Sequence, residues 1–180
     1  MYWVLGLGNP GSEYARTRHN AGFQAVDLLA SKYGIPVDRQ GCHAMGGVGK
    51  IKGEEILIAK PMTYMNESGK SARALMKAED LDPGQLIVLH DEIDLPVGKI
   101  KRKFGGGHAG QKGVRSIIER LETDKFYRVR IGVGRPNNRA DLVDHVLSEF
   151  NEDEQAQFNL TLDLAVERVE EILTELRSRQ

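Results

Sequence analysis

The stretch LIVLHDEIDLPVGKIKRKFGGGHAGQKG, residues 86–113, decides the fold that this sequence predicts. It opens on four apolar residues, Leu86–Leu89, which follow the turn-forming Asp82–Gly84. An apolar run bounded in this way is typical of a short buried strand. The run ends in His-Asp-Glu at residues 90–92. Because open α/β sheets bind ligands at the carboxyl ends of their strands, we expect these polar side chains at a functional edge of a sheet.

The same stretch continues into a cationic, glycine-rich segment. Lys99, Lys101 and Lys103 lie two residues apart, so they share one face of an extended chain. Three glycines follow at 105–107, and backbone N–H groups in such a segment can turn toward an anion. Phosphate binding is one interpretation, and an edge strand that lysines protect from aggregation is the other. An acid at a strand end beside this segment indicates hydrolysis of a substrate that carries phosphates.

Length and composition limit the classes of protein. A chain of 180 residues predicts one domain over residues 1–180, and 40% hydrophobic with 28% charged residues is ordinary for a globular protein. The formal net charge of -1 excludes a uniformly basic surface, so nucleic-acid binding has to be local. The single Cys42 excludes an internal disulfide and fits a reducing compartment. Without a leader or an apolar run of about 18 residues, we expect a cytoplasmic protein that makes no use of a membrane.

The other segments alternate between strand and helix patterns. Strands are expected at residues 2–7 and 126–133, and a hairpin at residues 44–51 and 54–59. Hairpins and crossovers together predict an α/β fold in a single domain, with a twisted mixed sheet sandwiched between helices. Helices are expected from a cap at Asn20 to Gly34, after a cap at Asn66 or Ser68, and at residues 114–121, 141–147 and 151–179.

The segment GLGNPG, residues 6–11, matches the dinucleotide-binding pattern G-x-G-x-x-G. That pattern requires a helix that opens at its third glycine, whereas Asn-Pro-Gly indicates a turn. A nucleotide-dependent oxidoreductase is therefore an alternative that rests on this match alone. Absence of cofactor absorbance and of stabilisation by nucleotide would dispose of it.

Polar loops around His19, Asn66 and Asp91 lie beside expected strand ends. If these loops meet at one edge of the sheet, their side chains share a pocket. A histidine held by a buried carboxylate is a competent general base for water, and side-chain amides can orient a carbonyl or its oxyanion. Only one of His90 and Asp91 can face such a pocket, because adjacent strand residues point to opposite faces.

Local sequence also offers a structural interpretation of each residue. Asn9 can be a turn former, Asn66 a helix cap and His19 an ordinary loop residue. Asp91 can pair with a lysine or cap a turn. The chain has no serine or cysteine in a nucleophile elbow and no histidines at ligand spacing. Neither a covalent acyl intermediate nor a catalytic metal is therefore expected.

Together the motifs resemble those of the bacterial-type peptidyl-tRNA hydrolase family. The resemblance implies a single α/β domain and hydrolysis, with neither metal nor cofactor, of the ester that joins a peptide to the 3′ end of tRNA. Such hydrolysis recycles tRNA from prematurely released chains. The matching segments follow the family's order: GLGNPG at 6–11 with Tyr14, TRHNAG at 17–22, KPMTYMNESG at 60–69, HDEIDLP at 90–96, GGGHAG at 105–110 and RVRIGVGRP at 128–136.

The resemblance also implies catalytic roles. His19 corresponds to the catalytic base and Asp91 to the acid that orients it. Asn9 and Asn66 correspond to asparagines that position the peptide main chain, the water or the oxyanion. An N-blocked substrate presents a peptide group that these amides can pair, whereas a free aminoacyl-tRNA presents a charged amine that is costly to desolvate. The enzyme is therefore expected to spare aminoacyl-tRNA.

Further positions correspond to substrate and tRNA contacts in the family. Tyr14 and Met65 match residues of the substrate pocket. Lys101, Lys103 and Arg130 match basic residues that bind acceptor-stem phosphates. The implied partner is peptidyl-tRNA, through its acceptor stem and 3′ CCA end, and the chain is expected to act as a monomer.

One pair departs from the family pattern. After Gly-Gly-Gly-His-Ala-Gly the family usually has His-Asn or Asn-Asn, but this chain has Gln111-Lys112. The missing asparagine is associated in the family with the substrate and a bound water. Gln111 is one candidate to replace it in part, although it sits one position early. Lys112 is expected to bind substrate, by stabilising negative charge or by contacting the terminal phosphate of tRNA. The alternative is a catalytically weak RNA-binding relative of the same fold.

Overall fold

The computed structural model describes residues 1–179, so Gln180, the last residue of the expected domain, lies outside the described part. Its centre is a seven-stranded mixed sheet in the order β2-β3-β4-β1-β5-β7-β6. Strands β4, β1, β5 and β7 run parallel, and β3 and β6 run against them. The strands are β1 (Tyr2–Gly6), β2 (Arg39–Gly41), β3 (Ala44–Ile51), β4 (Glu54–Pro61), β5 (Leu86–Glu92), β6 (Ile100–Phe104) and β7 (Tyr127–Gly132).

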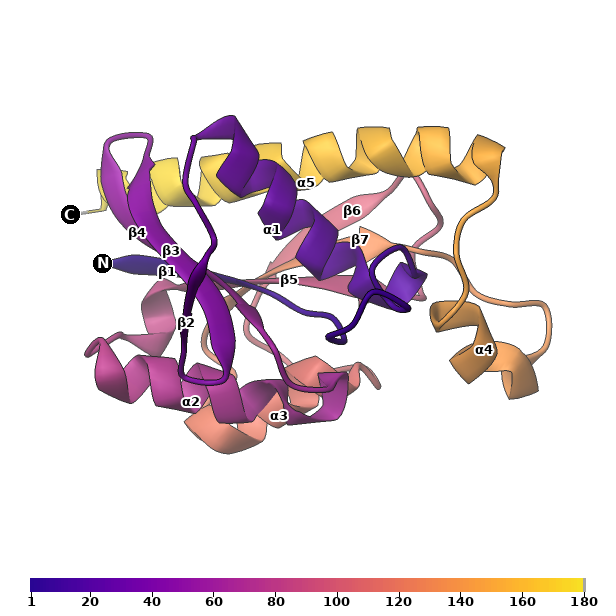
Figure 1. Ribbon diagram of the computed structural model, residues 1–180, viewed down its shortest axis with the longest axis horizontal. Helices are drawn as coiled ribbons and strands as arrows, with labels where there is room; N and C mark the ends of the chain where they lie inside the picture. The colour runs from indigo at the N-terminus through magenta and orange to yellow at the C-terminus, as the bar shows by residue number, and fades with distance from the viewer. Residues whose placement is uncertain (180) are drawn as a thin grey trace.

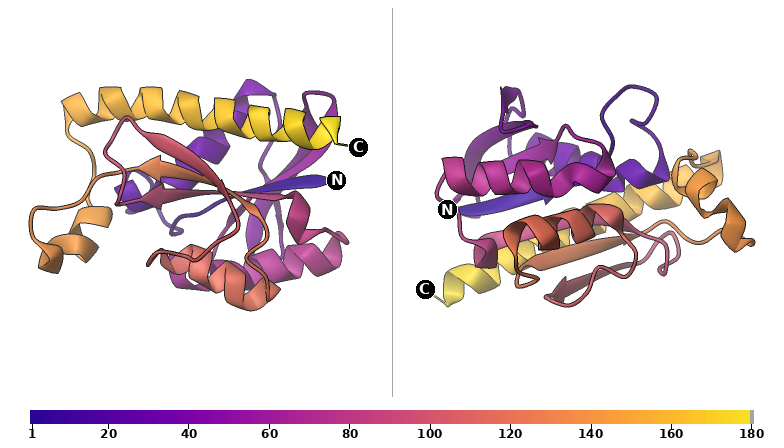
Figure 2. Two further views of the ribbon diagram at one scale, coloured as in Figure 1. Left: turned by 180° about the vertical axis from the view of Figure 1, so that it is seen from behind. Right: turned by 90° about the horizontal axis from the view of Figure 1, so that it is seen from below.

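Helices cover both faces of the sheet. Figures 1 and 2 show α1 and α5 on one face, α2 and α3 on the other, and α4 beyond the carboxyl ends of the parallel strands. This arrangement confirms the predicted α/β class. Within residues 1–179, no helix combines the length and the apolar character that crossing a membrane requires. The helices are α1 (Ala21–Lys32), α2 (Ser68–Ala78), α3 (Lys112–Leu121), α4 (Leu142–Val146) and α5 (Glu152–Ser178).

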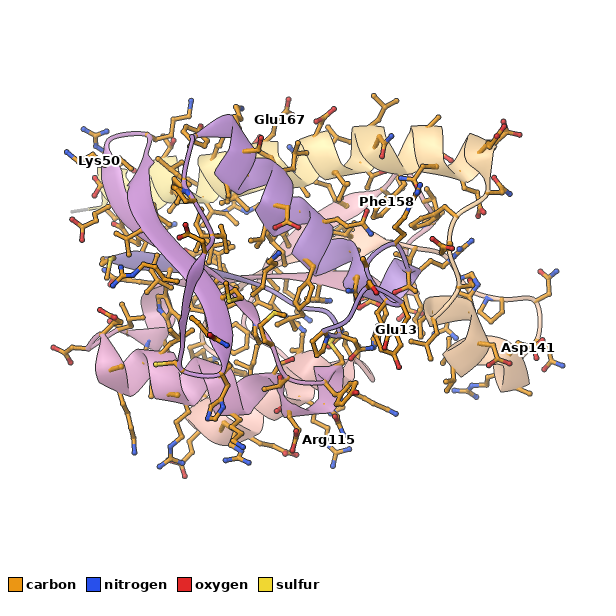
Figure 3. The ribbon with its side chains drawn as sticks, viewed as in Figure 1. Glu13, Lys50, Arg115, Asp141, Phe158 and Glu167 are labelled. Atoms are coloured by element: carbon orange, nitrogen blue, oxygen red, sulfur yellow. The ribbon has the colours of Figure 1, made fainter. Side chains whose placement is uncertain are left out.

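The central strands are buried on both faces. Every residue of β1 and β5 is buried, which explains why both strands read as continuous apolar runs. Alternate side chains enter two separate cores. Phe158 belongs to the core beneath α1 and α5, and Trp3 to the core beneath α2 and α3. Figure 3 shows Phe158 on the side of α5 that faces the sheet, whereas Glu167 is exposed to solvent.

Two of the expected helix caps are wrong. Asn20 occupies the N-cap position of α1, but its side chain makes no capping hydrogen bond, because it pairs with the backbone of Asn9 instead. Helix α2 begins at Ser68 after a single 3-10 turn, and neither Asn66 nor Ser68 caps it. The hairpin prediction is confirmed, with positive φ at Lys52 and Gly53 in its turn. Strand β2 was not expected.

Helix α1 begins in close contact with β1 and β5 because residue 22 has no side chain. A Cβ atom at Gly22 would lie 2.3 Å from the carbonyl oxygen of Leu89 and 2.4 Å from the nitrogen of Leu7. A Cβ atom at Gly6 would lie 2.2 Å from the Gly22 carbonyl oxygen. The first glycine of GLGNPG therefore allows helix and strand to touch, and no helix opens at Gly11. This packing brings the turn before α1 to the end of β5.

We expect Gly22→Ala to lower the free energy of unfolding by about 1–3 kcal/mol, the usual cost of overpacking, because the new methyl group would meet backbone atoms. Chemical denaturation measures this change. Gly41→Ala is the matched control: a Cβ atom at Gly41 meets no atom within 4 Å, and such surface changes stay within about 0.5 kcal/mol. Equal stabilities of the two variants would contradict the close packing of α1.

Candidate active site

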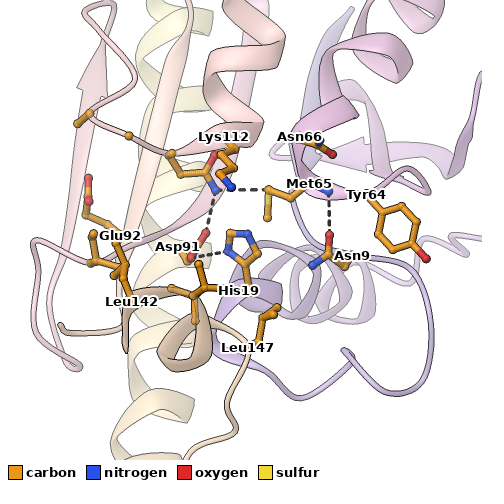
Figure 4. Close-up of a pocket in the computed structure, with 16 residues that line it drawn as sticks. Asn9, His19, Tyr64, Met65, Asn66, Asp91, Glu92, Lys112, Leu142 and Leu147 are labelled. Carbon is orange, nitrogen blue, oxygen red and sulfur yellow. Dashed lines mark hydrogen bonds and ion pairs between the residues drawn. The ribbon is translucent and has the colours of Figure 1, made fainter. Parts of the chain in front are cut away.

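A pocket of about 270 Å³ opens at the carboxyl ends of the central strands. Figure 4 shows its walls, which come from the loops before α1 and α2, from β5, from the start of α3 and from α4. One side is polar and the other is an apolar wall. The polar side includes Asn9, His19, Asn66, Asp91, Gln111 and Lys112, and the apolar wall consists of Ile93, Leu142, Val143, Val146 and Leu147.

His19 and Asp91 meet in this pocket, as the sequence predicted. His19 lies in the 3-10 turn Arg18–Asn20, and its Nδ1 is 2.8 Å from Oδ2 of Asp91. Asp91 lies near the end of β5, and its side chain is only 3% exposed. A carboxylate at this distance accepts a hydrogen bond from Nδ1–H, so Nε2 is the unprotonated, basic nitrogen of the ring. The pair therefore has the geometry of a general base and its orienting acid.

Opposing effects set the pKa of His19. Burial lowers the pKa of this ring, while the charge of Asp91 and its hydrogen bond together raise the pKa by more. The nearby ammonium group of Lys112 lowers it again. The net result is a pKa above the usual 6.5. His19 is thus a stronger base than free imidazole, and Lys112 moderates that effect.

His90 faces the opposite side of β5. Its Nδ1 donates a hydrogen bond to the carbonyl oxygen of Asp91 at 2.8 Å. Burial, with the charges of Arg128 and Arg130, lowers the pKa of His90 to about 4 despite the raising effect of Asp91. The ring is therefore neutral at physiological pH and is not a lining residue of the pocket. The expectation that only one of these neighbours faces the pocket is confirmed.

Asn9 both forms a turn and lines the pocket. Its backbone N–H donates to Oδ1 of Asn20 at 2.9 Å, and its carbonyl accepts from Nδ2 of the same side chain at 2.9 Å. Its own Oδ1 accepts the backbone N–H of Met65 at 2.7 Å. Because Oδ1 is engaged in this way, Nδ2 is the donor that Asn9 can offer to a substrate. The same bond holds the loop before α2 against the loop before α1.

The other predicted pocket residues differ in position. Met65 is buried and Asn66 is exposed, and both line the pocket. Lys112 lines it from the first turn of α3. Tyr14 is not a lining residue: its ring packs edge-on against Tyr64, with 6.5 Å between centroids, and Tyr64 lines the pocket in its place.

Gln111 is a member of the site that sequence reasoning did not assign. Its Nε2 donates to Oδ1 of Asp91 at 2.8 Å, and its Oε1 accepts from the backbone N–H of Val114 at 2.8 Å. The apolar wall from α4 was also not expected as part of the site. The apolar residues of that short helix were the signal that could have indicated it.

Arg18, the neighbour of His19, ties this turn to the segment between α4 and α5 and to the first turn of α5. Its guanidinium donates to both carboxylate oxygens of Glu154 at 3.0 and 2.8 Å and to the Glu149 carbonyl at 2.6 Å. It also lies 4.5 Å from the centroid of the Phe150 ring. With a side chain only 7% exposed, Arg18 is a buried anchor for the turn that carries His19.

The predicted phosphate-binding residues lie together on two paired strands. Lys101 of β6 is in register with Arg130 of β7, so both point to the same face of the sheet. Lys101 and Lys103 are exposed, and within residues 1–179 neither has a carboxylate within 4.0 Å. Arg130 is 3.7 Å from Glu92, which lines the pocket. β6 is also an edge strand. Protection of that edge from aggregation therefore remains an interpretation of its lysines beside phosphate binding.

Comparison with known proteins decides the family. Residues 3–180 match the family model described as peptidyl-tRNA hydrolase. The chain belongs to the peptidyl-tRNA hydrolase family. A protein named peptidyl-tRNA hydrolase from Bacillus pumilus is 42% identical over 174 residues, which cover 97% of this chain and 93% of the relative. One from Syntrophotalea carbinolica is 43% identical over 173 residues, 96% of this chain and 91% of the relative.

Solved structures of peptidyl-tRNA hydrolases have the same fold. The crystal structure of peptidyl-tRNA hydrolase from Acinetobacter baumannii has a TM-score of 0.93 and 39% identity, over 99% of this chain and 91% of that chain. A crystal structure of a peptidyl-tRNA hydrolase in complex with N-propanol has a TM-score of 0.90 and 41% identity, over 94% and 87% of the two chains. The resemblance seen in the sequence motifs is confirmed. Among residues 1–179, no three His, Cys, Asp or Glu side chains are grouped as metal ligands are.

We expect the His19 ring to titrate above 6.5, its usual pKa. Asp91→Asn should lower the pKa of His19 below that value, because the raising charge is removed while burial remains. Lys112→Met should raise it, because an opposing positive charge is removed. NMR titration of the histidine rings measures both shifts. His90, with a pKa of about 4, is the internal control for Lys112→Met only, because the charge of Asp91 also raises the pKa of His90. A His19 pKa that stays unchanged in Asp91→Asn would refute this account.

Proposed function

We propose that this protein hydrolyses the ester between a peptide, or an N-acylated amino acid, and the 3′ end of tRNA, and so recycles tRNA from prematurely released peptidyl-tRNA. The observation that carries the proposal is the 2.8 Å contact between Nδ1 of His19 and Oδ2 of Asp91. Membership of the peptidyl-tRNA hydrolase family supports the same reaction.

In this reaction His19 acts as the general base. Its Nε2 removes a proton from a water molecule while the water oxygen attacks the ester carbonyl carbon. The carbonyl becomes a tetrahedral oxyanion, and the imidazolium that forms is stabilised by Asp91. The bond to the ribose oxygen then breaks, and His19 returns the proton to that oxygen. The products are a tRNA with an intact 3′ hydroxyl and a free peptide, whose new carboxyl group releases its proton to the solvent.

The polar side of the pocket holds the peptide and the developing charge. We assign to Asn9 and Asn66 the positioning of the peptide group and the oxyanion, because amide donors near a reacting carbonyl stabilise its transition state. Lys112 contributes a positive charge to the same side, where it attracts the oxyanion or the terminal phosphate of tRNA. Met65 shapes the floor, and Tyr14 supports Tyr64 at the pocket. The apolar wall from α4 faces the side chains of the peptide.

The strip of Lys101, Lys103 and Arg130 is proposed to bind phosphates of the acceptor stem and so to direct the 3′ CCA end into the pocket. The formal net charge of -1 supports a local contact rather than attraction over the whole surface. The 3.7 Å contact between Arg130 and Glu92, which lines the pocket, supports a strip at the border of the pocket. We further propose that residues 1–180 form one domain and that the protein acts as a cytoplasmic monomer.

The pair Gln111-Lys112 is the feature that favours the alternative, an RNA-binding relative with weak or no hydrolysis. Against that alternative, Gln111 bonds to Asp91 and leaves the contact between His19 and Asp91 in place. An assay that follows release of the acyl-amino acid from N-acylated aminoacyl-tRNA separates the two functions. Tight, salt-sensitive binding without release would favour the RNA-binding relative.

We expect His19→Ala to lower kcat in this assay by ~10²–10⁴, the usual contribution of a general base. The dissociation constant for tRNA should change little, because His19 lies in the pocket and not on the basic strip. Filter binding with uncharged tRNA is the control, and free aminoacyl-tRNA is the substrate that the enzyme should spare. Turnover retained within a few-fold would exclude His19 as the base.

We expect Lys103→Ala to weaken tRNA binding and to reduce the slope of log Kd against log salt concentration by roughly 1, as the loss of one phosphate contact does. Lys50→Ala is the matched control, because Figure 3 shows Lys50 at the far end of the β3–β4 hairpin. Titrations at several salt concentrations measure both slopes. The proposed strip would be wrong if the two variants changed the slope equally.

A further inference from the structure

We propose that Gln111 is a positioning residue, whose amide holds the Asp91 carboxylate in the one orientation that also binds His19. The inference rests on the proposed function, because it gives Gln111 a role only if His19 and Asp91 are the catalytic pair. It concerns a position where this chain departs from the pattern of the peptidyl-tRNA hydrolase family. It therefore assigns a role that the family likeness does not supply.

The orientation of the Gln111 amide is fixed by the helix that it caps. Residue 111 is the N-cap of α3, and the free N–H of Val114 requires an acceptor, which is Oε1 at 2.8 Å. With the oxygen held in this way, the NH₂ group has to point to the other side. There it meets Oδ1 of Asp91 at 2.8 Å and lies 3.4 Å from Sδ of Met65. The start of α3 thus presents a donor to the end of β5.

Asp91 is held through both of its oxygens by partners from different elements. Oδ2 bonds to His19 in the turn before α1, and Oδ1 bonds to Gln111 at the start of α3. A carboxylate with a single partner can rotate about its last torsion, which is broad. Two donors on opposite oxygens remove that freedom. Gln111 is therefore required to keep Oδ2 directed at the imidazole.

Gln111 supplies this donor without adding charge. The titratable groups that line the pocket are His19, Tyr64, Asp91, Glu92 and Lys112. A neutral amide donates a hydrogen bond to the Asp91 carboxylate without adding a charge beside it, and that carboxylate stabilises the imidazolium. A group that carried a negative charge at position 111 would compete with Asp91 for a proton. The role of Gln111 can therefore be tested by changing its charge while its shape and its helix cap are retained.

The decisive variant is Gln111→Glu, with kcat for N-acylated aminoacyl-tRNA measured from pH 5.5 to 9 after subtraction of uncatalysed hydrolysis. One carboxylate oxygen still caps α3, and the other faces Oδ1 of Asp91. At low pH, the carboxyl groups of residue 111 and Asp91 share one proton, which takes the place of the hydrogen bond from the Gln111 amide. At high pH that proton is lost, and the two negative charges repel each other. The kcat of the native enzyme should rise with pH to a plateau. Gln111→Glu should instead give a bell-shaped profile that falls about 10-fold or more below native at high pH.

Two further variants separate positioning from folding. Gln111→Met lacks both the donor to Asp91 and the oxygen that caps α3, and it should lower kcat about 10-fold at every pH, with KM unchanged. Gln111→His also lacks that oxygen but restores an N–H, and it should recover kcat to within about 3-fold of native. If Gln111→Glu does not fold, the loss of kcat in Gln111→Met and its recovery in Gln111→His decide the proposal. A Gln111→Glu profile parallel to the native one, or Gln111→Met with native kcat, would overturn it. If instead the native protein released no acyl-amino acid from N-acylated aminoacyl-tRNA, the proposed function itself would fail.

Discussion

The hydrogen bond between His19 and Asp91 depends on folding, because these residues are 72 positions apart in the chain. Asp91 arrives at the pocket on the central buried strand β5. His19 arrives on the turn before α1, and that turn reaches β5 only because the helix lies directly on the strand backbone at Gly22. The packing of helices on the sheet is therefore the scaffold that holds Nδ1 of His19 at hydrogen-bond distance from Oδ2 of Asp91.

The sequence alone could predict what depends on local pattern. The buried run of β5, the hairpin and the amphipathic α5 each have a periodicity that fixes their type, and the polar loops at strand ends indicated where a site would form. Local pattern failed where a polar side chain had two possible partners. Asn20 looked like a helix cap but pairs with Asn9, and a capping residue at 111 gave no sign that its free NH₂ group meets Asp91. These choices are made by tertiary contacts between segments far apart in sequence.

Charged side chains are arranged differently near the pocket and on β6. Near the pocket, charged and polar partners lie across short distances: Glu92 is 3.7 Å from Arg130, and Asp91 is 2.8 Å from His19, whose pKa the ammonium of Lys112 lowers. Lys101 and Lys103 of β6 have no carboxylate within 4.0 Å within residues 1–179, and neither lines the pocket. A nearly neutral protein can thus combine an acidic catalytic centre with a cationic border, since each acts over a distance of about one Debye length or less.

Arg18 has a mechanical consequence. The same guanidinium that anchors the turn of the catalytic base also grips the connection between α4 and α5, and α4 provides the apolar wall of the pocket. Through Arg18, the turn that carries His19 is connected to the chain segment that carries the apolar wall. A displacement of the wall large enough to break these bonds would also loosen the His19 ring from Asp91, so the catalytic pair keeps its geometry only while the wall stays in place.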